Sequence, residues 1–301
     1  MTTTKSGCLK YRELSYEVSR QVTRHYSTSF YSASQLFSAP VRNAIYGIYG
    51  FVRLADEIVD SFQGYDQRVM LDQFESDFDF ARKLHVSSNP VIHAFLLTVN
   101  RYGIEDAYIR AFLASMRADL EKKVYVTQLE TDQYIYGSAD VVGLMCLRVF
   151  CDNDKSLFEE LKVRAMRLGS AFQKVNFLRD LRQDVIELGR VYFPGFSMEQ
   201  FNEQSKQTLV REVQADFAEA QQGIHRLPDS SRLAVQTAFR YYLRLLDKIR
   251  DTPAQKLVSR RIRVHNAEKF HLMLGAVIKQ KFHLENVQNG HLQIPTLLSV
   301  P

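Results

Sequence analysis

Apolar residues recur three and four positions apart along nearly the whole 301-residue chain, and this helical period limits the fold more than any other feature of the sequence. Ser, Asp, Asn or Pro stand at the starts of the periodic segments, as at helix N-termini. Alternating strand patterns bounded by turn residues are hard to find. The period predicts ten helices, to within a few residues, at about 10–27, 39–62, 66–85, 90–101, 105–123, 131–151, 156–188, 198–224, 229–251 and 255–282. The sequence therefore predicts an all-α fold.

The segments between these helices contain no linker that would divide the chain. Glycine (13) and proline (7) are few, and no Ser-, Gly- or Pro-rich stretch interrupts the pattern. A composition of 46% hydrophobic and 24% charged residues over this length is enough to bury a large core. We expect a single domain spanning 1–301, with a structured core at about 10–282 and a tail at 283–301.

The charge pattern bears on the kind of ligand. The net charge is +5, from 39 basic and 34 acidic residues, and the basic residues are mostly dispersed. This argues weakly for an anionic ligand and against nucleic acid, because nucleic-acid binders concentrate their charge. The tightest basic group is Arg260, Arg261 and Arg263, for which a solvated helix face is the simplest interpretation.

Cysteine usage and hydropathy bear on the compartment. Cys8, Cys146 and Cys151 have no metal-ligand spacing, and their odd number gives no disulfide framework. The N-terminus lacks an apolar signal region, and no apolar run approaches the roughly 20 residues that span a bilayer. The longest run, VVGLMCLRVFC, contains Arg148. We expect a cytoplasmic protein that does not span a membrane, with a peripheral membrane contact and the oligomeric state left open.

Two predicted helices are apolar on more than one face, which indicates a central position. They are the segments 39–60 and 133–150. The second contains a run of small residues, which would let either a neighbouring helix or a long ligand come close. These residues are Gly137, Ser138, Ala139 and Gly143.

Acidic residues occur at helical spacing in two motifs with unusual surroundings. In FVRLADEIVDS, Asp56 and Asp60 share one helical face and follow a run too apolar to be solvated. In NFLRDLRQD, Asn176, Asp180 and Asp184 do the same beside Phe and Leu residues. A buried carboxylate is costly unless it is paired or binds a metal ion.

These motifs indicate a site for a metal ion and a diphosphate. Carboxylate oxygens without histidine or thiol partners suit Mg²⁺, which shares its remaining positions with substrate phosphates. Arg53 and Arg179, beside the two motifs, would bind phosphate oxygens. The alternative is structural: internal Asp/Arg salt bridges that join two helices.

Aromatic residues on the same helices indicate what the diphosphate is attached to. Loss of pyrophosphate from an allylic chain leaves a carbocation, which aromatic faces stabilise in a pocket without water. For each of these residues, ordinary core packing is the alternative. The set is Tyr46, Tyr49, Phe51, Tyr134, Tyr136, Phe172 and Phe177.

Four motifs, RLADEIVD, YIYGSADVVG, QKVNFLRDLRQD and GRVYFP, follow in this order between HYSTSF near the start and RRIRVH near the end. With this set the chain resembles the squalene and phytoene synthases, which join two isoprenoid diphosphates head to head. Each motif alone is weak evidence, whereas four in order are specific. The resemblance implies an isoprenoid synthase-type helical bundle with a central active-site cavity.

The resemblance also implies a reaction, and the motifs look most like those of bacterial phytoene synthases. The expected reaction condenses two C20 geranylgeranyl diphosphates to phytoene through a cyclopropylcarbinyl (prephytoene) diphosphate. Mg²⁺, or Mn²⁺ in its place, would assist the loss of pyrophosphate, and NADPH is not expected. The alternative enzyme is a squalene or dehydrosqualene synthase that uses two C15 farnesyl diphosphates. The non-enzymatic alternative is an inactive relative acting as an assembly factor, against which the intact aspartates argue.

The resemblance assigns roles to residues in the matching motifs. The implied metal ligands are Asp56, Asp60, Asn176, Asp180 and Asp184, and the implied catalytic residues are the four aspartates together with Tyr134. The implied substrate-binding residues are Ser27, Ser29, Phe30, Arg53, Gln173, Asn176, Arg179, Arg190, Tyr192, Tyr242 and Arg261, with Arg260 or Arg263 as alternatives to the last.

One position departs from the family pattern. Where the family usually has Val-Ala-Gly, this chain has Ser138, Ala139 and Asp140, which are more polar. If this helix lines the hydrocarbon pocket, the change affects the preferred chain length. Alternatively, Asp140 faces another helix and pairs with an arginine.

Overall fold

A computed structural model describes residues 2–196, 201–259 and 261–264 of the chain. Its regular structure is helical apart from one isolated parallel bridge between Val124 and Val191. The all-α prediction is therefore confirmed for the described residues. The α-helices are α1 (Thr2–Tyr26), α2 (Thr28–Ser34), α3 (Ala39–Ser61), α4 (Gln67–Leu84), α5 (Pro90–Tyr102), α6 (Asp106–Glu121), α7 (Gln128–Ile135), α8 (Val141–Cys151), α9 (Lys155–Arg182), α10 (Glu203–Ile224), α11 (Asp229–Asp251) and α12 (Ala254–Leu257). Two π-helical turns, η1 (Tyr136–Asp140) and η2 (Gln183–Glu187), continue α7 and α9.

The observed helices differ from the predicted ones mainly at their ends. Ser27 caps a separate short helix, α2, because its side chain accepts a hydrogen bond from the backbone N–H of Phe30. The predicted helix at 131–151 is found as α7, η1 and α8 in succession, and the one at 156–188 as α9 and η2. The π turn η1 lies within a continuing helix, whereas η2 forms the last turn of its helix.

The prediction of a helix at 255–282 is wrong for the described residues that follow α12. Beyond Leu257 the chain leaves the helical conformation, and at 261–264 it is not helical. There Ile262 and Val264 are buried while Arg261 and Arg263 are exposed, the alternation typical of an extended segment. Residues 265–282 and the predicted tail at 283–301 lie outside the described residues.

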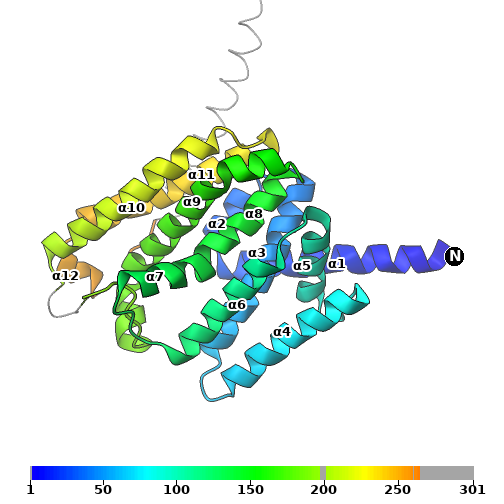
Figure 1. The fold of residues 1–301 in the computed structure, drawn as a ribbon, viewed down its shortest axis with the longest axis horizontal. Helices are drawn as coiled ribbons and strands as arrows, with labels where there is room; N and C mark the ends of the chain where they lie inside the picture. The colour runs from blue at the N-terminus through cyan, green and yellow to red at the C-terminus, as the bar shows by residue number, and fades with distance from the viewer. Residues whose placement is uncertain (1, 197–200, 260, 265–301) are drawn as a thin grey trace, which may run out of the picture.

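The core lies around α3, which contacts α1, α5, α6 and α8. Phe51 of α3 is fully buried and stacks on Phe95 of α5, with ring centroids 4.1 Å apart. Figure 1 shows α9, α10 and α11 side by side on one flank and α4 at the other edge, while the N-terminal part of α1 extends beyond the body. Both segments that were expected to be central contain long buried runs, in α3 and in α8.

The small residues before and in α8 allow close helix packing. A Cβ atom on Gly137 would lie 2.7 Å from the carbonyl oxygen of Ala111 in α6, and one on Gly143 would lie 2.9 Å from that of Ala165 in α9. Both distances are shorter than a carbon–oxygen contact allows. The sequence left open whether these small residues admit a neighbouring helix or a long ligand. For these two glycines the answer is a neighbouring helix.

The helical stretch Gln128–Cys151 is long and apolar enough to cross a membrane by length and composition alone. However, 61% of its most apolar window is buried inside the protein, as in the core helix of a globular fold. No membrane-spanning role follows from this stretch.

Candidate active site

The first acidic motif occupies one face of α3 near its C-terminal end. Asp56 and Asp60 are both half-buried there. Arg53, one turn earlier, forms ion pairs with Asp56 and with Glu57, and its guanidinium lies 4.2 Å from the ring centre of Tyr26. Burial, followed by the charge of Asp60, raises the pKa of Asp56 to about 6. The motif is therefore a crowded group of charges whose carboxylates would gain from a cation.

Arg190 joins this motif to the segment that follows η2. Its buried guanidinium donates from Nη1 to Asp60 Oδ1 at 2.6 Å. Nη2 reaches the carbonyl oxygens of Val59 at 3.4 Å and Asp119 at 3.5 Å. The bridge between Val124 and Val191 holds the same segment against the chain after α6. Residues 130 positions apart in the sequence thus meet at Asp60.

The second motif lies at the end of α9 and in η2. Asp180 pairs with its neighbour Arg179 and also with Arg261, whose Nε lies 2.6 Å from Oδ1 and whose Nη2 lies 3.2 Å from Oδ2. Burial and the charge of Asp180 raise the pKa of Asp184 to about 7, and the charge of Asp60 acts in the same direction. Asp184 therefore lies within electrostatic reach of the first motif, and the two motifs share one region.

Asn176 and Gln173 lie earlier on α9, and both are half-buried. The hydroxyl of Tyr242 in α11 donates to Asn176 Oδ1 at 3.4 Å. The Tyr242 ring stacks on Phe172, with ring centroids 3.9 Å apart and an interplanar angle of 18°. This contact brings α11 to the face of α9 that carries the second motif.

The residues expected to contact diphosphate near the N-terminus lie at the start of α2. Ser27 Oγ accepts from Phe30 N at 3.3 Å, and Ser29 is half-buried in the first turn. The Phe30 ring stacks on Tyr49 with ring centroids 5.0 Å apart. The charge of Arg53 acts on the pKa of Tyr49, which burial raises to about 12. The start of α2 is thus close to the first motif.

Tyr134 lies in a buried aromatic cluster beside these charges. Its ring stacks on Tyr192 at 5.0 Å, and Tyr192 stacks on Phe177 at 4.1 Å between ring centroids. Tyr125 completes the group, 4.9 Å from Tyr134. The cluster therefore contains two predicted site residues, Tyr134 and Tyr192, and Tyr192 lies two positions after Arg190 in the sequence.

Asp119 is a buried carboxylate of the site that the sequence analysis missed. Its side chain accepts a hydrogen bond from the Tyr134 hydroxyl at 2.8 Å through Oδ2, while Oδ1 is buried without a hydrogen-bond partner. Burial raises the pKa of Asp119 to about 7, against the opposing effect of the Arg190 charge. Asp119 stands in the ordinary helical segment RADLEKK, so no spacing or motif marks it.

Asp140 faces another helix, as one of the two interpretations held, but its partner there is not an arginine. Ser170 Oγ of α9 donates to Asp140 Oδ1 at 2.7 Å. Burial raises the pKa of Asp140 to about 6, and the Ser170 hydrogen bond and the charge of Arg167 oppose the rise. The polar side chain is thus accommodated by a serine one helix away.

The three candidate C-terminal arginines can be compared in part. The Arg261 side chain contacts Asp180, whereas Arg263 contributes its carbonyl oxygen, which accepts from Lys248 Nζ at 3.4 Å. Arg260 lies outside the described residues. Arg261 is therefore the described arginine of this group that reaches the second motif.

Oxygen donors on facing helices fit a hard cation such as Mg²⁺. In the described parts of the chain, however, no three acidic, histidine or cysteine side chains are gathered closely enough to hold an ion. Asp56, Asp60 and Asp180 are instead paired with arginines. These carboxylates fit Mg²⁺ when the arginines pair with a different anion instead. A bound diphosphate would be such an anion.

Two cavities contact helices of this region, and one of them reaches the acidic motifs. One of about 10 Å³ is lined by Asp184, Arg190 and Tyr192, among other residues. One of about 60 Å³ lies between α8, α9, α10 and α11 and is mostly apolar, with Leu147 and Leu168 in its wall. The smaller cavity thus joins the second acidic motif to Arg190, whereas the larger one contacts neither acidic motif.

Comparison with known proteins identifies relatives over most of the chain. The sequence model of the squalene/phytoene synthase family matches residues 23–268. A 15-cis-phytoene synthase from Synechocystis sp. is 33% identical over 264 residues, which are 79% of this chain and 77% of that protein. A phytoene synthase from Arthrospira platensis is 31% identical over 274 residues, or 81% of this chain and 88% of that one.

Solved structures agree on the fold. A dehydrosqualene synthase in complex with a ligand superposes with a TM-score of 0.78 at 21% identity, covering 90% of this chain and 98% of its own. A squalene synthase from Alicyclobacillus acidocaldarius gives a TM-score of 0.69 at 22% identity, covering 83% and 97%. At this identity the likeness bears on the fold alone.

Proposed function

Because the chain belongs to the squalene/phytoene synthase family and is a prenyl-transferring enzyme, we propose that it condenses two geranylgeranyl diphosphates head to head to give phytoene. The similarity to phytoene synthases at 31% and 33% identity supports this product class over squalene. The C15 reaction is the alternative, and product chain length distinguishes the two.

The observation that carries the proposal is the meeting of two acidic motifs and several arginines in one region. Asp60 and Arg190 join the first motif to the segment after η2, and Asp180 pairs with Arg179 and Arg261 at the second. Guanidinium groups bind phosphate oxygens in pairs. A diphosphate would take over these guanidinium contacts and release the carboxylates to bind Mg²⁺.

The reaction has two ionisation steps, and this chain's residues would serve both. Bound Mg²⁺ would supply charge neutralisation of the pyrophosphate leaving group. Arg53, Arg179 and Arg261 would bind and orient the diphosphates. The first ionisation releases one pyrophosphate; the double bond of the second substrate attacks the cation, and loss of a proton closes the ring of the cyclopropylcarbinyl diphosphate. The second ionisation releases the other pyrophosphate and leads, after rearrangement and loss of a second proton, to phytoene.

The aromatic cluster would face the cationic carbons. Tyr134, Tyr192 and Phe177 stack on one another, and aromatic rings stabilise nearby positive charge without capturing it. Their burial keeps water from quenching the cation. We propose that the prenyl chains lie beside this cluster with their diphosphates at the acidic motifs.

Incubation with prenyl diphosphates tests the function. The protein is given C15 or C20 diphosphate with Mg²⁺, with Mn²⁺ or with EDTA, each with and without NADPH, and the hydrocarbons are analysed. We expect phytoene from the C20 substrate without NADPH and no product in EDTA. A C30 product would favour the squalene-type alternative, and no hydrocarbon under any condition would reject the proposal.

Alanine variants separate the metal site from the salt-bridge alternative. We expect Asp60→Ala and Asp180→Ala to abolish turnover while leaving the fold intact. Asp72→Ala is the matched control, since Asp72 pairs with Arg117 on the surface, away from the motifs. If Asp60→Ala unfolds the protein while any folded fraction keeps its activity, the carboxylate has a structural role only.

A further inference from the structure

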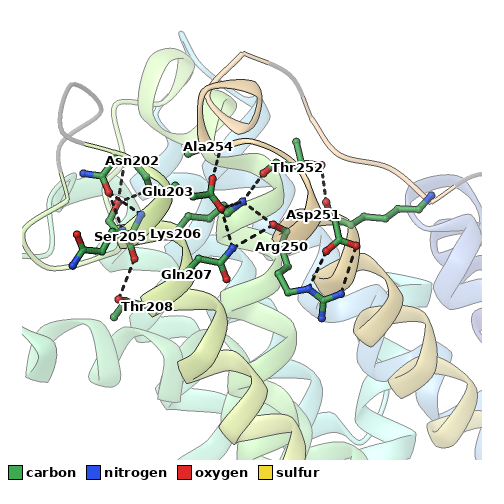
Figure 2. Close-up of polar contacts among 12 residues, drawn as sticks. Asn202, Glu203, Ser205, Lys206, Gln207, Thr208, Arg250, Asp251, Thr252 and Ala254 are labelled. Atoms are coloured by element: carbon green, nitrogen blue, oxygen red, sulfur yellow. Dashed lines mark hydrogen bonds and ion pairs between the residues drawn. The ribbon is translucent and has the colours of Figure 1, made fainter.

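Lys206 is a charged side chain that lies almost wholly inside the protein. Only 1% of it is exposed, although lysine is rarely buried unless its ammonium group is paired. Its Nζ donates to the carbonyl oxygens of Arg250 at 2.7 Å and Thr252 at 2.6 Å, and it pairs with Glu203 Oε1 at 2.7 Å (Figure 2). Since an ammonium group has three protons, these contacts use all of its donors.

The two carbonyl groups lie at the C-terminal end of α11. Carbonyls of a last helical turn lack partners within the helix, and that end carries partial negative charge. Figure 2 shows Lys206 reaching this end from the first turn of α10. Glu203 extends the contact to α12, because its Oε2 accepts from Ala254 N at 3.3 Å. The start of α10 thus fixes the corner between α11 and α12.

The chain that leaves this corner carries Arg261 to the candidate active site. Leu257, at the end of α12, is buried, and so is Ile262 beyond it. Between them Arg261 extends to Asp180, with Nε 2.6 Å from Oδ1. The place of Arg261 therefore depends on where the corner holds α12.

We propose that Lys206, with Glu203, is a positioning residue that holds the α11–α12 corner so that Arg261 binds the diphosphate at Asp180. The role rests on the proposed function, which assigns a diphosphate to this end of the molecule. Removal of the ammonium group takes away the Lys206 donor from the Thr252 carbonyl and leaves the Arg250 carbonyl with the longer contact from Gln207 Nε2 at 3.5 Å, which weakens the hold on the corner. A shift of about 1 Å in a binding residue is enough to cost a large factor in rate.

A double-mutant cycle tests the proposal. Lys206→Met, Arg261→Ala and the double variant are compared in steady-state kinetics and in calorimetric binding of inorganic pyrophosphate with Mg²⁺. We expect Lys206→Met to raise KM and the pyrophosphate Kd about tenfold, with a smaller change in kcat. The double variant should have the same KM and pyrophosphate Kd as Arg261→Ala alone, because Lys206 acts through Arg261.

Arg148→Met is the matched control for a purely structural role. Arg148 forms a half-buried ion pair with Glu105, and its side chain is 15% exposed. We expect this variant to lower Tm and leave KM and pyrophosphate binding unchanged. The proposal is overturned if Lys206→Met behaves in the same way, or if its effect adds in full to that of Arg261→Ala.

Glu203→Gln keeps the test open if Lys206→Met does not fold. Glu203 is 57% exposed, so its substitution leaves the fold intact while weakening the pair, and we expect the same changes at smaller size. Hydrogen exchange gives a readout independent of turnover: exchange at 254–259 should rise in either variant and stay unchanged in Arg148→Met. Unchanged exchange there overturns the proposal, whereas a failure to turn over any prenyl diphosphate rejects only the proposed function.

Discussion

Asp119 shows how a single residue can matter to the site without leaving a signal in the sequence. Its buried carboxylate meets the Tyr134 hydroxyl and the charge of Arg190 only because α6, α7 and the segment after η2 converge. The paired aspartates of the two motifs could be found from spacing and apolar flanks. Asp119 and Lys206 could not, because their partners are distant in sequence and, for Lys206, are backbone carbonyls.

At this scale, Tyr134→Phe should destabilise the protein at pH 8. The variant removes the hydroxyl that donates to Asp119 at 2.8 Å, and Oδ1 of the same carboxylate already lacks a partner. Above its pKa of about 7 the carboxylate is ionised, so we expect a loss of about 1–3 kcal/mol in the free energy of unfolding. Urea denaturation measures it.

The control for this prediction is Tyr136→Phe. Tyr136 follows closely in the same helical stretch but is exposed, so its hydroxyl is solvated in both states. A Tyr134→Phe variant as stable as Tyr136→Phe would contradict the assigned role of the hydrogen bond.

Asp140→Asn should show a pH-dependent gain in stability over the parent protein. The pKa of Asp140 is raised from 3.8 to about 6 in the folded state by burial. Its contribution to stability is therefore present at low pH and is lost as the pH rises through about 6. We expect the variant to gain about 2 kcal/mol relative to the parent between pH 4.5 and pH 7.5.

Thermal or urea unfolding of both proteins across this range checks the prediction for Asp140. Arg167 and Lys174 lower this pKa and Asp216 raises it, so all three are kept unchanged. Ser170→Ala removes the donor that lowers the pKa and should steepen the pH dependence of stability. A stability difference that does not vary with pH would count against a buried, titrating Asp140.

At the scale of elements, the helical period predicted most helices but not how they end. Helix termini depend on capping contacts such as that of Ser27, and on whether the next segment finds a partner. The segment at 261–264 leaves the helical conformation where Ile262 and Val264 are buried against the body. A period counted along the chain does not contain that tertiary contact.

Arg190→Met tests the link between α3 and the segment after η2. Removing one partner of a buried ion pair costs about 3–5 kcal/mol. The Asp60 side chain is 31% exposed, so water can solvate its carboxylate in the variant. We therefore expect the free energy of unfolding to fall by about 1–2 kcal/mol. We expect turnover to fall below detection, since the same side chain is proposed to bind substrate.

Urea denaturation and product analysis measure these effects for Arg190→Met. Arg182→Met is the neighbouring control, because Arg182 is 47% exposed and pairs with Glu187 on the surface. Its free energy of unfolding should change by less than about 0.5 kcal/mol. Equal effects of the two variants would mean that Arg190 does not join these elements.

At the scale of the whole molecule, a bound ligand should stabilise the fold by joining elements that otherwise meet through arginines. Mg²⁺ and inorganic pyrophosphate together, at about 100 times their dissociation constant, should add about 2.7 kcal/mol. Thermal unfolding should therefore show a higher Tm with both than with either alone, and no rise in Asp180→Ala. If Tm still rises with both ligands in Asp180→Ala, pyrophosphate binds at a site that does not include Asp180.

The fold class could be predicted for the whole molecule because helical period is a local property. The two acidic motifs could also be found from short stretches of sequence, and the order of the motifs along the chain showed the resemblance to a family. Their pairing with Arg190 and Arg261 needed the tertiary structure, since nothing along the chain shows which arginine faces which aspartate.

The ion pairs at the candidate site have a consequence for the order in which the protein forms. Asp60 and Arg190 are 130 residues apart, and Asp180 and Arg261 are 81 apart, whereas each helix closes its own hydrogen bonds within four residues. Local contacts form early, and contacts between distant residues form later. During synthesis from the N-terminus, the helices before α10 are complete while Arg261 has not yet been added. A nascent chain therefore acquires helix content well before it acquires the site, and pyrophosphate binding should mark the last stage of its folding.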